Sequence, residues 1–325
     1  MDSNEPTSIV DFMRTLHDDN DLVLASLYRL SDLTPEELSY FDDAWDGLGD
    51  ERRRVIIRHL ADITEENFQV DFSAVFARCL GDSSPAVRVA ALDGLWDSER
   101  LSLLGPIMEL MVSDPDLEVR TLAAATIGHY ILLAEWDVIP PESTRATIDA
   151  LLSVLDEPDN PGPLRRAALE SVSASSHERV PGLVEDAYDS GDHELQVSAI
   201  YAMGRTVDKR WLPIVIDEMA SSNSEMRIEA ARAAGHIGST DAVAELADLI
   251  ADDDLEVQLA AIAALGQIGG SLAIRILDDL DGDPDFEHVQ YAISEAQEEA
   301  FWLDNFDLTL LDWDNDEQDY RSISV

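Results

Sequence analysis

EMRIEAARAAGHIG, residues 225 to 238, is the stretch that decides the fold, because its spacing recurs along most of the chain. EVQLAAIAALGQIG stands thirty-one residues downstream, and ELQVSAIYAMGRT stands thirty-one residues upstream. The alignment superimposes two sets of residues, nine positions apart: Leu195, Met226 and Val257, and Gly204, Gly235 and Gly266. A helical pattern with a period of about 20 to 50 residues indicates a solenoid, in which each unit buries its apolar face by stacking on its neighbours.

The same apolar anchor position can be followed toward both ends of the chain. Further anchors stand at Val87, Val119, Leu164 and Val289. The step before Leu164 is 45 residues, because a loop containing Pro140-Pro141 lengthens that unit. Thr34-Pro35-Glu36-Glu37 is a capping box that starts one more helix pair, over residues 34–63. We therefore predict an all-α fold, a right-handed alpha-solenoid of about eight antiparallel helix pairs. The predicted division is an N-terminal cap over 1–33, the repeats over 34–300, and an acidic aromatic tail or cap over 301–325.

Each repeat position has a physical reason. The anchor begins a buried stripe that continues at offsets of four, eight and eleven residues. Paired alanines favour helix and let neighbouring helices approach closely. Gly238 and Gly269 stand where a left-handed cap would end a helix. The residue after the anchor is expected to reach the acidic turn of its own or an adjacent unit, as arginine or as the uncharged donor glutamine: Arg88, Arg120, Arg165, Arg227, Gln196, Gln258 and Gln290.

The charge balance restricts the partners. Asp and Glu number 68 against 21 Lys and Arg, which gives a net charge of -47. Such a field repels nucleic acid and anionic membranes, so neither is predicted as a partner. The surplus either attracts a protein with a basic surface at low salt or keeps the protein soluble in a saline cytoplasm.

The remaining composition indicates a cytoplasmic protein. Cys79 is the only cysteine, which leaves no intramolecular disulfide or cysteine metal cluster. The amino terminus lacks the features of a signal peptide, and no apolar run is long enough for a membrane helix. No oligomeric state is indicated.

The motif V-R-x-x-A-A followed by L-G or I-G, at a period near 31, resembles the HEAT-like repeats first associated with phycobilin lyases. The resemblance covers residues 82 to 300. The chain also resembles bacterial HEAT-repeat proteins that carry phrases present here as Gly94-Leu95-Trp96, Arg165 to Glu170, Ser198 to Arg205 and Glu229 to Gly235. The repeats imply the fold only, since such units serve as adaptors, lyases, enzyme subunits and an iron-dependent hydroxylase.

Two enzyme classes are the alternatives that the resemblance implies. In the deoxyhypusine hydroxylase type, His-Glu dipeptides near the starts of inner helices hold two irons. This chain has His177-Glu178, His193-Glu194 and a reversed Glu287-His288, but no histidine directly after the repeat arginines. A phycobilin lyase would need a tetrapyrrole cavity, which nothing outside the repeats indicates. Nucleotide-loop and hydrolase motifs are absent from the sequence. We therefore predict no enzyme activity, no catalytic residues, no metal site and no cofactor.

The leading hypothesis is a non-catalytic protein-protein interaction scaffold, and three groups of residues are candidate contacts. The first is a row of polar residues that follow the repeat glycine, and the second is a basic-aromatic group. The third is the tail, whose aromatic residues either cap the last repeat or bind a partner. The candidates are, in that order, His129, Arg205, His236 and Gln267; Lys209, Arg210 and Trp211; and Trp302, Phe306 and Trp313.

Overall fold

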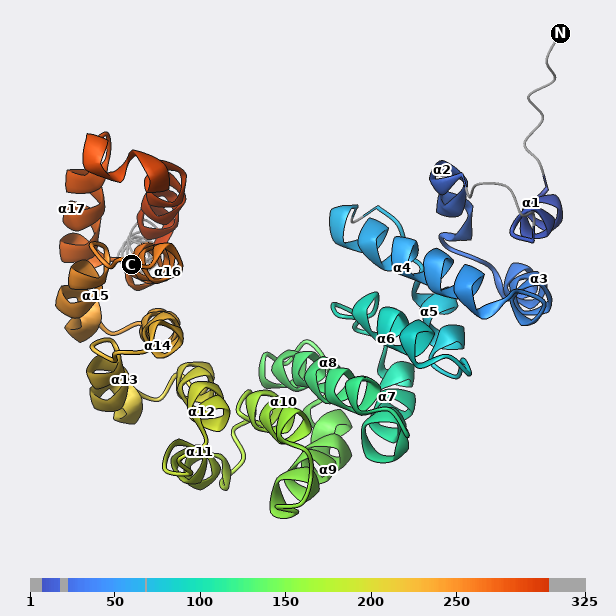
Figure 1. The fold of residues 1–325 in the computed structure, drawn as a ribbon, viewed down its shortest axis with the longest axis horizontal. Coiled ribbons are helices and arrows are strands. Elements are labelled where there is room, and N and C mark those ends of the chain that lie inside the picture. The colour runs from blue at the N-terminus through green and yellow to red at the C-terminus, as the bar shows by residue number, and fades with distance from the viewer. Residues whose placement is uncertain (1–7, 18–22, 68, 304–325) are drawn as a thin grey trace, which may run out of the picture. The chain divides into compact units, whose positions relative to one another are not determined.

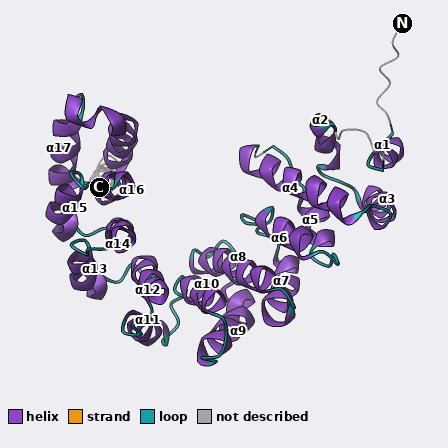
Figure 2. Cartoon of the chain, viewed as in Figure 1, coloured by secondary structure: helices purple, strands orange, loops and turns teal. Residues whose placement is uncertain are grey.

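The structure, a computed structural model, describes residues 8–17, 23–67 and 69–303. These residues form helices joined by turns and loops, without a strand among them (Figure 2). The chain divides into two compact units, Met1–Ser175 and Ser176–Val325, and each is described by itself.

The first unit begins with short segments that pack on its first helix pair. The helix α1 (Ile9–Thr15) packs on α3, and α2 (Leu24–Leu27), which continues into the 3-10 turn η1 (Tyr28–Leu30), packs on α4. Four helix pairs follow: α3 (Pro35–Asp46) with α4 (Asp50–Glu66), α5 (Ser73–Cys79) with α6 (Pro85–Asp93), α7 (Leu101–Ser113) with α8 (Leu117–Glu135), and, after η2 (Pro141–Thr144), α9 (Arg145–Asp156) with α10 (Gly162–Val172). The second helices α4, α6, α8 and α10 pack in succession (Figure 1).

The second unit repeats the arrangement. Its first pair is α11 (Val180–Tyr188) with α12 (His193–Arg205). In the next two pairs a 3-10 turn precedes the first helix: η3 (Lys209–Trp211) precedes α13 (Leu212–Glu218), which pairs with α14 (Ser224–Ile237), and η4 (Thr240–Ala242) precedes α15 (Val243–Leu249), which pairs with α16 (Leu255–Ile268). In the last pair, α17 (Gly270–Leu280) is followed by the turn η5 (Pro284–Val289) and then by a helix over 290–303. The helices α12, α14 and α16 pack in succession. Eight helix pairs thus follow residue 34 within the described ranges, which confirms the predicted α-solenoid; the boundaries at residues 33 and 300 stay predictions.

The predicted stripe forms the core of both units. All seven anchors are buried, from Val87 to Val289. The paired alanines are also buried: Ala90, Ala91, Ala123, Ala124, Ala167, Ala168, Ala230, Ala231, Ala260 and Ala261. Since alanine removes side-chain bulk at the seam, successive second helices lie close together.

The repeat glycines permit that close approach. A Cβ atom on Gly204 would lie 2.7 Å from the Cα of Ala233 on the next second helix, and one on Gly266 would lie 2.8 Å from the Cα of Ala296. Both distances are shorter than carbon atoms tolerate. These glycines therefore belong to the stacking of units rather than to a ligand loop.

The arginine after the anchor ties one unit to the next, as predicted. Arg88 forms a two-pronged ion pair with Asp114, and Arg227 does the same with Asp252, each carboxylate lying in the turn of the following unit. The glutamines at this position instead donate to backbone carbonyls at the end of the preceding helix or in the turn that follows it. These bonds join Gln196 to Tyr188, Gln258 to Asp252, and Gln290 to Leu280.

Two arginines at this position depart from the prediction. Arg120 donates to the carbonyl of Met111 rather than to a carboxylate. The Nε atom of Arg165 is buried and has no hydrogen-bond partner in the described part of the chain. Within the first unit, the repeat therefore fixes the position of these guanidinium groups more strictly than it fixes what they bind.

The two predicted glycine caps differ. Gly238 has φ 68° and ψ 27°, the left-handed cap expected at the end of α14. Gly269 has φ 61° and ψ -152°, so it does not form that cap. The reason is that α17 starts at Gly270, and the chain must turn sharply from one helix into the next within a single residue.

Candidate functional site

A continuous groove runs over the second helices α4, α6 and α8 of the first unit. It consists of three adjoining pockets of about 410, 690 and 430 Å³. Neighbouring pockets share wall residues: the first two share Arg58, Val89 and Glu118, and the last two share Asp93, Leu122 and Ala125. We call this surface the α4–α8 groove. It is the candidate functional site.

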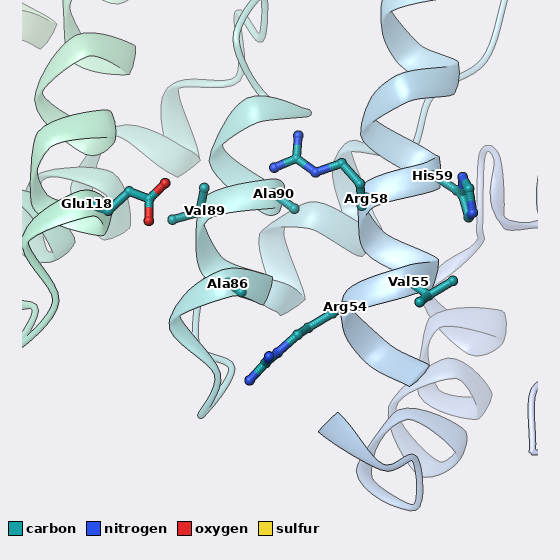
Figure 3. A pocket seen from close by; sticks show the side chains of 8 residues that line it. All are labelled: Arg54, Val55, Arg58, His59, Ala86, Val89, Ala90 and Glu118. Carbon is teal, nitrogen blue, oxygen red and sulfur yellow. The ribbon is translucent and has the colours of Figure 1, made fainter. Parts of the chain in front are cut away.

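Arginines of α4 line the first pocket. Arg54 and Arg58 extend from α4 along the side that faces Val89 and Glu118, whereas His59 points away from them (Figure 3). Each arginine already has a carboxylate partner: Arg54 pairs with Asp50 on its own helix, and Arg58 pairs with Asp93 across to α6. Both arginines that line this pocket are therefore neutralised by nearby acids.

The floor of the groove is apolar. The central pocket is lined by Val89, Leu117, Leu122, Ala125 and Pro163, the last contributed by α10. Ala125 is exposed and has only a methyl group, so the middle of the floor presents little bulk. Glu118 stands at the rim, and its carboxylate forms no ion pair within the described ranges. An apolar floor with polar rims is typical of a protein-binding surface.

The third pocket combines an exposed indole with carboxylates. Trp96, which is 48% exposed, lines it together with Glu65, Asp93 and His129. The neighbouring residue Leu95 is fully buried, and it anchors the turn that carries Trp96 to the core. Burial lowers the pKa of His129, and the nearby Asp97 carboxylate and backbone act in the opposite direction. The imidazole is accordingly neutral at neutral pH.

The rest of the predicted polar row, Arg205, His236 and Gln267, lies in the second unit, on the ends of α12, α14 and α16. A Cβ atom on Gly204 would lie 3.4 Å from Nδ1 of His236, and one on Gly235 would lie 2.4 Å from Oε1 of Gln267. His236 and Gln267 thus cover the repeat glycine of the preceding helix, which gives these positions a structural role. Burial lowers the pKa of His236, and the charge of Arg205 adds to the effect.

The basic-aromatic group does not present an aromatic surface. Trp211 is only 2% exposed, so its indole belongs to the core of the second unit and is not available as a surface contact. The burial of Trp211 was not predicted from the sequence, because a tryptophan next to two charged residues is expected to lie at the surface. Arg210 pairs with Asp208 and lies 5.9 Å from the centre of the Trp211 ring, and Lys209 is exposed.

Of the predicted tail residues, only Trp302 is among the described residues. It is 71% exposed, and its ring lies 6.4 Å from that of Phe301. Phe306 and Trp313 lie outside the described residues.

The histidines considered for an iron site bind separate neighbours. His193 contacts Glu225 and Asn223, and His288 contacts Gln258. His177 accepts a hydrogen bond from the backbone of Arg179. Within the part of the chain that the structure describes, no group of three or more His, Cys, Asp or Glu side chains is placed to hold a metal ion.

Of the residues that line the groove, only His129 was predicted from the sequence as a contact. A usable signal existed in apolar residues that fall out of phase with the buried stripe. Val89 and Leu122 stand two and three positions after their anchors, and Trp96 stands nine positions after Val87. Such residues give a second helix another apolar face, which in the first unit forms the groove.

Comparison with known proteins agrees with this fold. A sequence model of HEAT repeats matches residues 212–296, so that this part of the chain consists of HEAT repeats. Since the same helix pair with the same buried anchor recurs before it, the protein is a HEAT-like repeat protein. No match was found among curated protein sequences. None of the described helices is long and apolar enough to cross a membrane.

Three solved structures illustrate the range of similar folds. YibA of Escherichia coli is 15% identical, with 87% of this chain and 98% of that one covered and a TM-score of 0.46. The complex of CpcE and CpcF of phycocyanin lyase from Nostoc is 16% identical, with 70% and 94% covered and a TM-score of 0.46. Human deoxyhypusine hydroxylase in complex with glycerol is 17% identical, with 90% and 95% covered and a TM-score of 0.35. These likenesses concern the repeat fold and carry no inference about activity.

Proposed function

We propose that this protein is a non-catalytic cytoplasmic scaffold that binds a protein partner through the α4–α8 groove. The observation that carries the proposal is the continuity of the three pockets along successive second helices. A long, open groove with an apolar floor suits a helix or an extended segment of another protein better than a small substrate, which is usually held in a more enclosed cleft.

The charges of the groove favour a partner with a basic surface. Arg54 and Arg58 are paired with acids, whereas Glu65 and Glu118 at the rims form no ion pair within the described ranges. The protein as a whole carries a net charge of -47, which steers cationic surfaces toward it at low ionic strength.

The groove offers little support for catalysis by a hydroxylase or a lyase. Burial lowers the pKa of His129 in the third pocket, which favours its uncharged form. The thiol of Cys79 is buried and its pKa is raised, chiefly by burial and also by the charge of Asp82. A thiol held in its protonated form is a poor nucleophile.

A groove-filling substitution tests the proposal. Ala125 is exposed and lines two of the three pockets, so Ala125→Trp fills the floor without entering the core. Affinity capture from the source cell at low ionic strength is expected to recover a protein with the native chain and to lose at least about nine-tenths of it with Ala125→Trp. The matched control is Val112→Trp, at a 56% exposed position on the first helix α7. Equal capture by both variants would contradict the proposal.

Further partner contacts outside the groove stay predictions: the polar row of Arg205, His236 and Gln267, and the tail residues.

A further inference from the structure

The pocket between Trp96 and Glu65 has the composition of a cation site. Its walls hold one exposed indole, two carboxylates and an imidazole, on a floor of Leu92, Leu122 and Ala125. Its volume of about 430 Å³ accommodates one long side chain with room to spare. No other exposed tryptophan lines any of the three pockets of the groove.

The charges in this pocket are not equivalent. Asp93 is paired with Arg58 at 2.8 Å, so its charge is largely offset. Glu65 is exposed near the end of α4 and forms no ion pair with residues 8–17, 23–67 or 69–303. The pocket therefore keeps one negative charge that a ligand can pair with, and the same pocket contains the exposed indole of Trp96.

The imidazole of His129 leaves that charge unopposed. Its Nε2 atom is buried and unpartnered in the described part of the chain, and burial lowers the pKa of the ring. A neutral His129 side chain lines the pocket without adding a positive charge. A cation that enters consequently meets attraction from Glu65 and from the face of the indole, where cation–π contact favours guanidinium over ammonium.

We propose that this pocket binds an arginine side chain of the protein partner, with the guanidinium group stacked on Trp96 and hydrogen-bonded to the carboxylate of Glu65. The inference rests on the proposed function of the α4–α8 groove and names the feature of the partner that the groove recognises. The central pocket beside it, with its apolar floor, then takes the flanking aliphatic residues of the same segment.

A pair of synthetic peptides separates charge from shape. The probe is an amphipathic peptide of leucine and alanine that carries one central arginine, and its counterpart carries citrulline, which has nearly the same shape without the charge. With the native chain, the arginine peptide is expected to bind about tenfold more tightly than the citrulline peptide. Isothermal titration at low ionic strength measures both affinities.

Two variants and two matched controls locate the preference. Trp96→Leu and Glu65→Gln are expected to reduce the preference for arginine to less than about threefold, while binding of the citrulline peptide changes little. Trp136→Leu, at a 65% exposed tryptophan outside the three pockets, and Glu66→Gln, one residue from Glu65, are expected to retain it.

The outcomes distinguish the two proposals. Equal binding of the two peptides to the native chain, abolished by Ala125→Trp, would overturn the arginine site and support the groove. A preference that persists in Trp96→Leu would place the cation elsewhere and also overturn the site. Absence of binding by either peptide, together with partner capture that Ala125→Trp does not reduce, would overturn both.

Discussion

Scarce arginines act as internal ties in this acidic chain. Arg88 and Asp114 retain 8% and 4% of their side-chain exposure, and Arg227 and Asp252 retain 17% and 11%. Each guanidinium also donates to a carbonyl of its own turn, at Asp82 or at Ser221. One side chain therefore fixes the turn of its own unit against the turn of the next, and the charge that does so is sheltered from solvent.

Loss of the carboxylate in such a tie should be costly. Asp252→Asn keeps the acceptor for the backbone of Asp254 but removes the carboxylate that binds Arg227 through two hydrogen bonds, so that only the nearby charges of Asp253 and Asp254 remain. We expect it to lower the free energy of unfolding by about 2 kcal/mol. The comparison is Asp11→Asn, which breaks the exposed pair with Arg14 and should cost no more than about 0.5 kcal/mol. Urea unfolding followed by circular dichroism measures both, and equal effects would refute the tie.

The same pair should make stability depend on pH. The hydrogen bond from Arg227 lowers the pKa of Asp252, so the folded pKa lies below the unfolded value of about 3.9. The contribution is complete above the unfolded pKa and is lost as the pH falls through the folded pKa. The stability difference between the native chain and Asp252→Asn is therefore expected to be constant from pH 7 to about pH 5 and to shrink below about pH 4. A difference that grew on acidification would have the wrong sign.

At the scale of helices, the seam between second helices limits what the repeat can accept. Gly204→Ala would place a methyl group 2.7 Å from the backbone of Ala233 in α14. The clash can be relieved only if α14 moves away from α12, which would disturb its packing on the other helices. We expect a loss of about 1 to 3 kcal/mol in the free energy of unfolding. Gly182→Ala is the control, because Gly182 lies in α11 with no atom within 4 Å of a new Cβ. That substitution should be neutral or stabilise by up to about 1 kcal/mol. Thermal unfolding compares them, and a tolerated Gly204→Ala would argue against a tight seam.

The helices could be predicted from the sequence because each has its own local pattern. The capping box at Thr34 is formed as expected, and the anchor Met226 and the alanines after it are buried. These features depend on spacing within one helix and the next. Gly269 was mispredicted because its backbone is set by where the following helix starts, which no residue within α16 specifies.

The candidate site depends on neighbouring helices, which is why the sequence revealed so little of it. Trp96 and Trp211 both follow the end of a second helix in the sequence, yet one is 48% exposed and the other is 2% exposed. The exposure of these indoles is therefore not set by their position after a helix end. The groove likewise requires α4, α6 and α8 side by side, and residues such as Glu65 and Leu122 acquire a shared pocket only through that packing.

At the scale of the whole molecule, the large net negative charge lowers the stability of the folded state. With a charge of -47 in 325 residues, carboxylates repel one another over the whole surface, and the folded state holds them closer together than the unfolded chain does. Salt shortens the range of this repulsion from about 30 Å at 0.01 M to about 3 Å at 1 M ionic strength. The melting temperature is therefore expected to rise with sodium chloride over this range, whereas binding of a basic partner is expected to weaken.

A partly neutralised variant shows whether repulsion is the cause of that dependence. Asp279→Asn, Glu298→Gln and Glu299→Gln change three exposed residues outside the groove, and removing three negative charges from -47 leaves -44. This variant should melt at a higher temperature than the native chain at 0.01 M sodium chloride, and the gap should close by 1 M because salt already screens the charges that were removed. Calorimetry at the two ionic strengths measures both gaps. If the gap were the same at 0.01 M and 1 M, the substitutions would act through local packing, and self-repulsion would not explain the response of the molecule to salt.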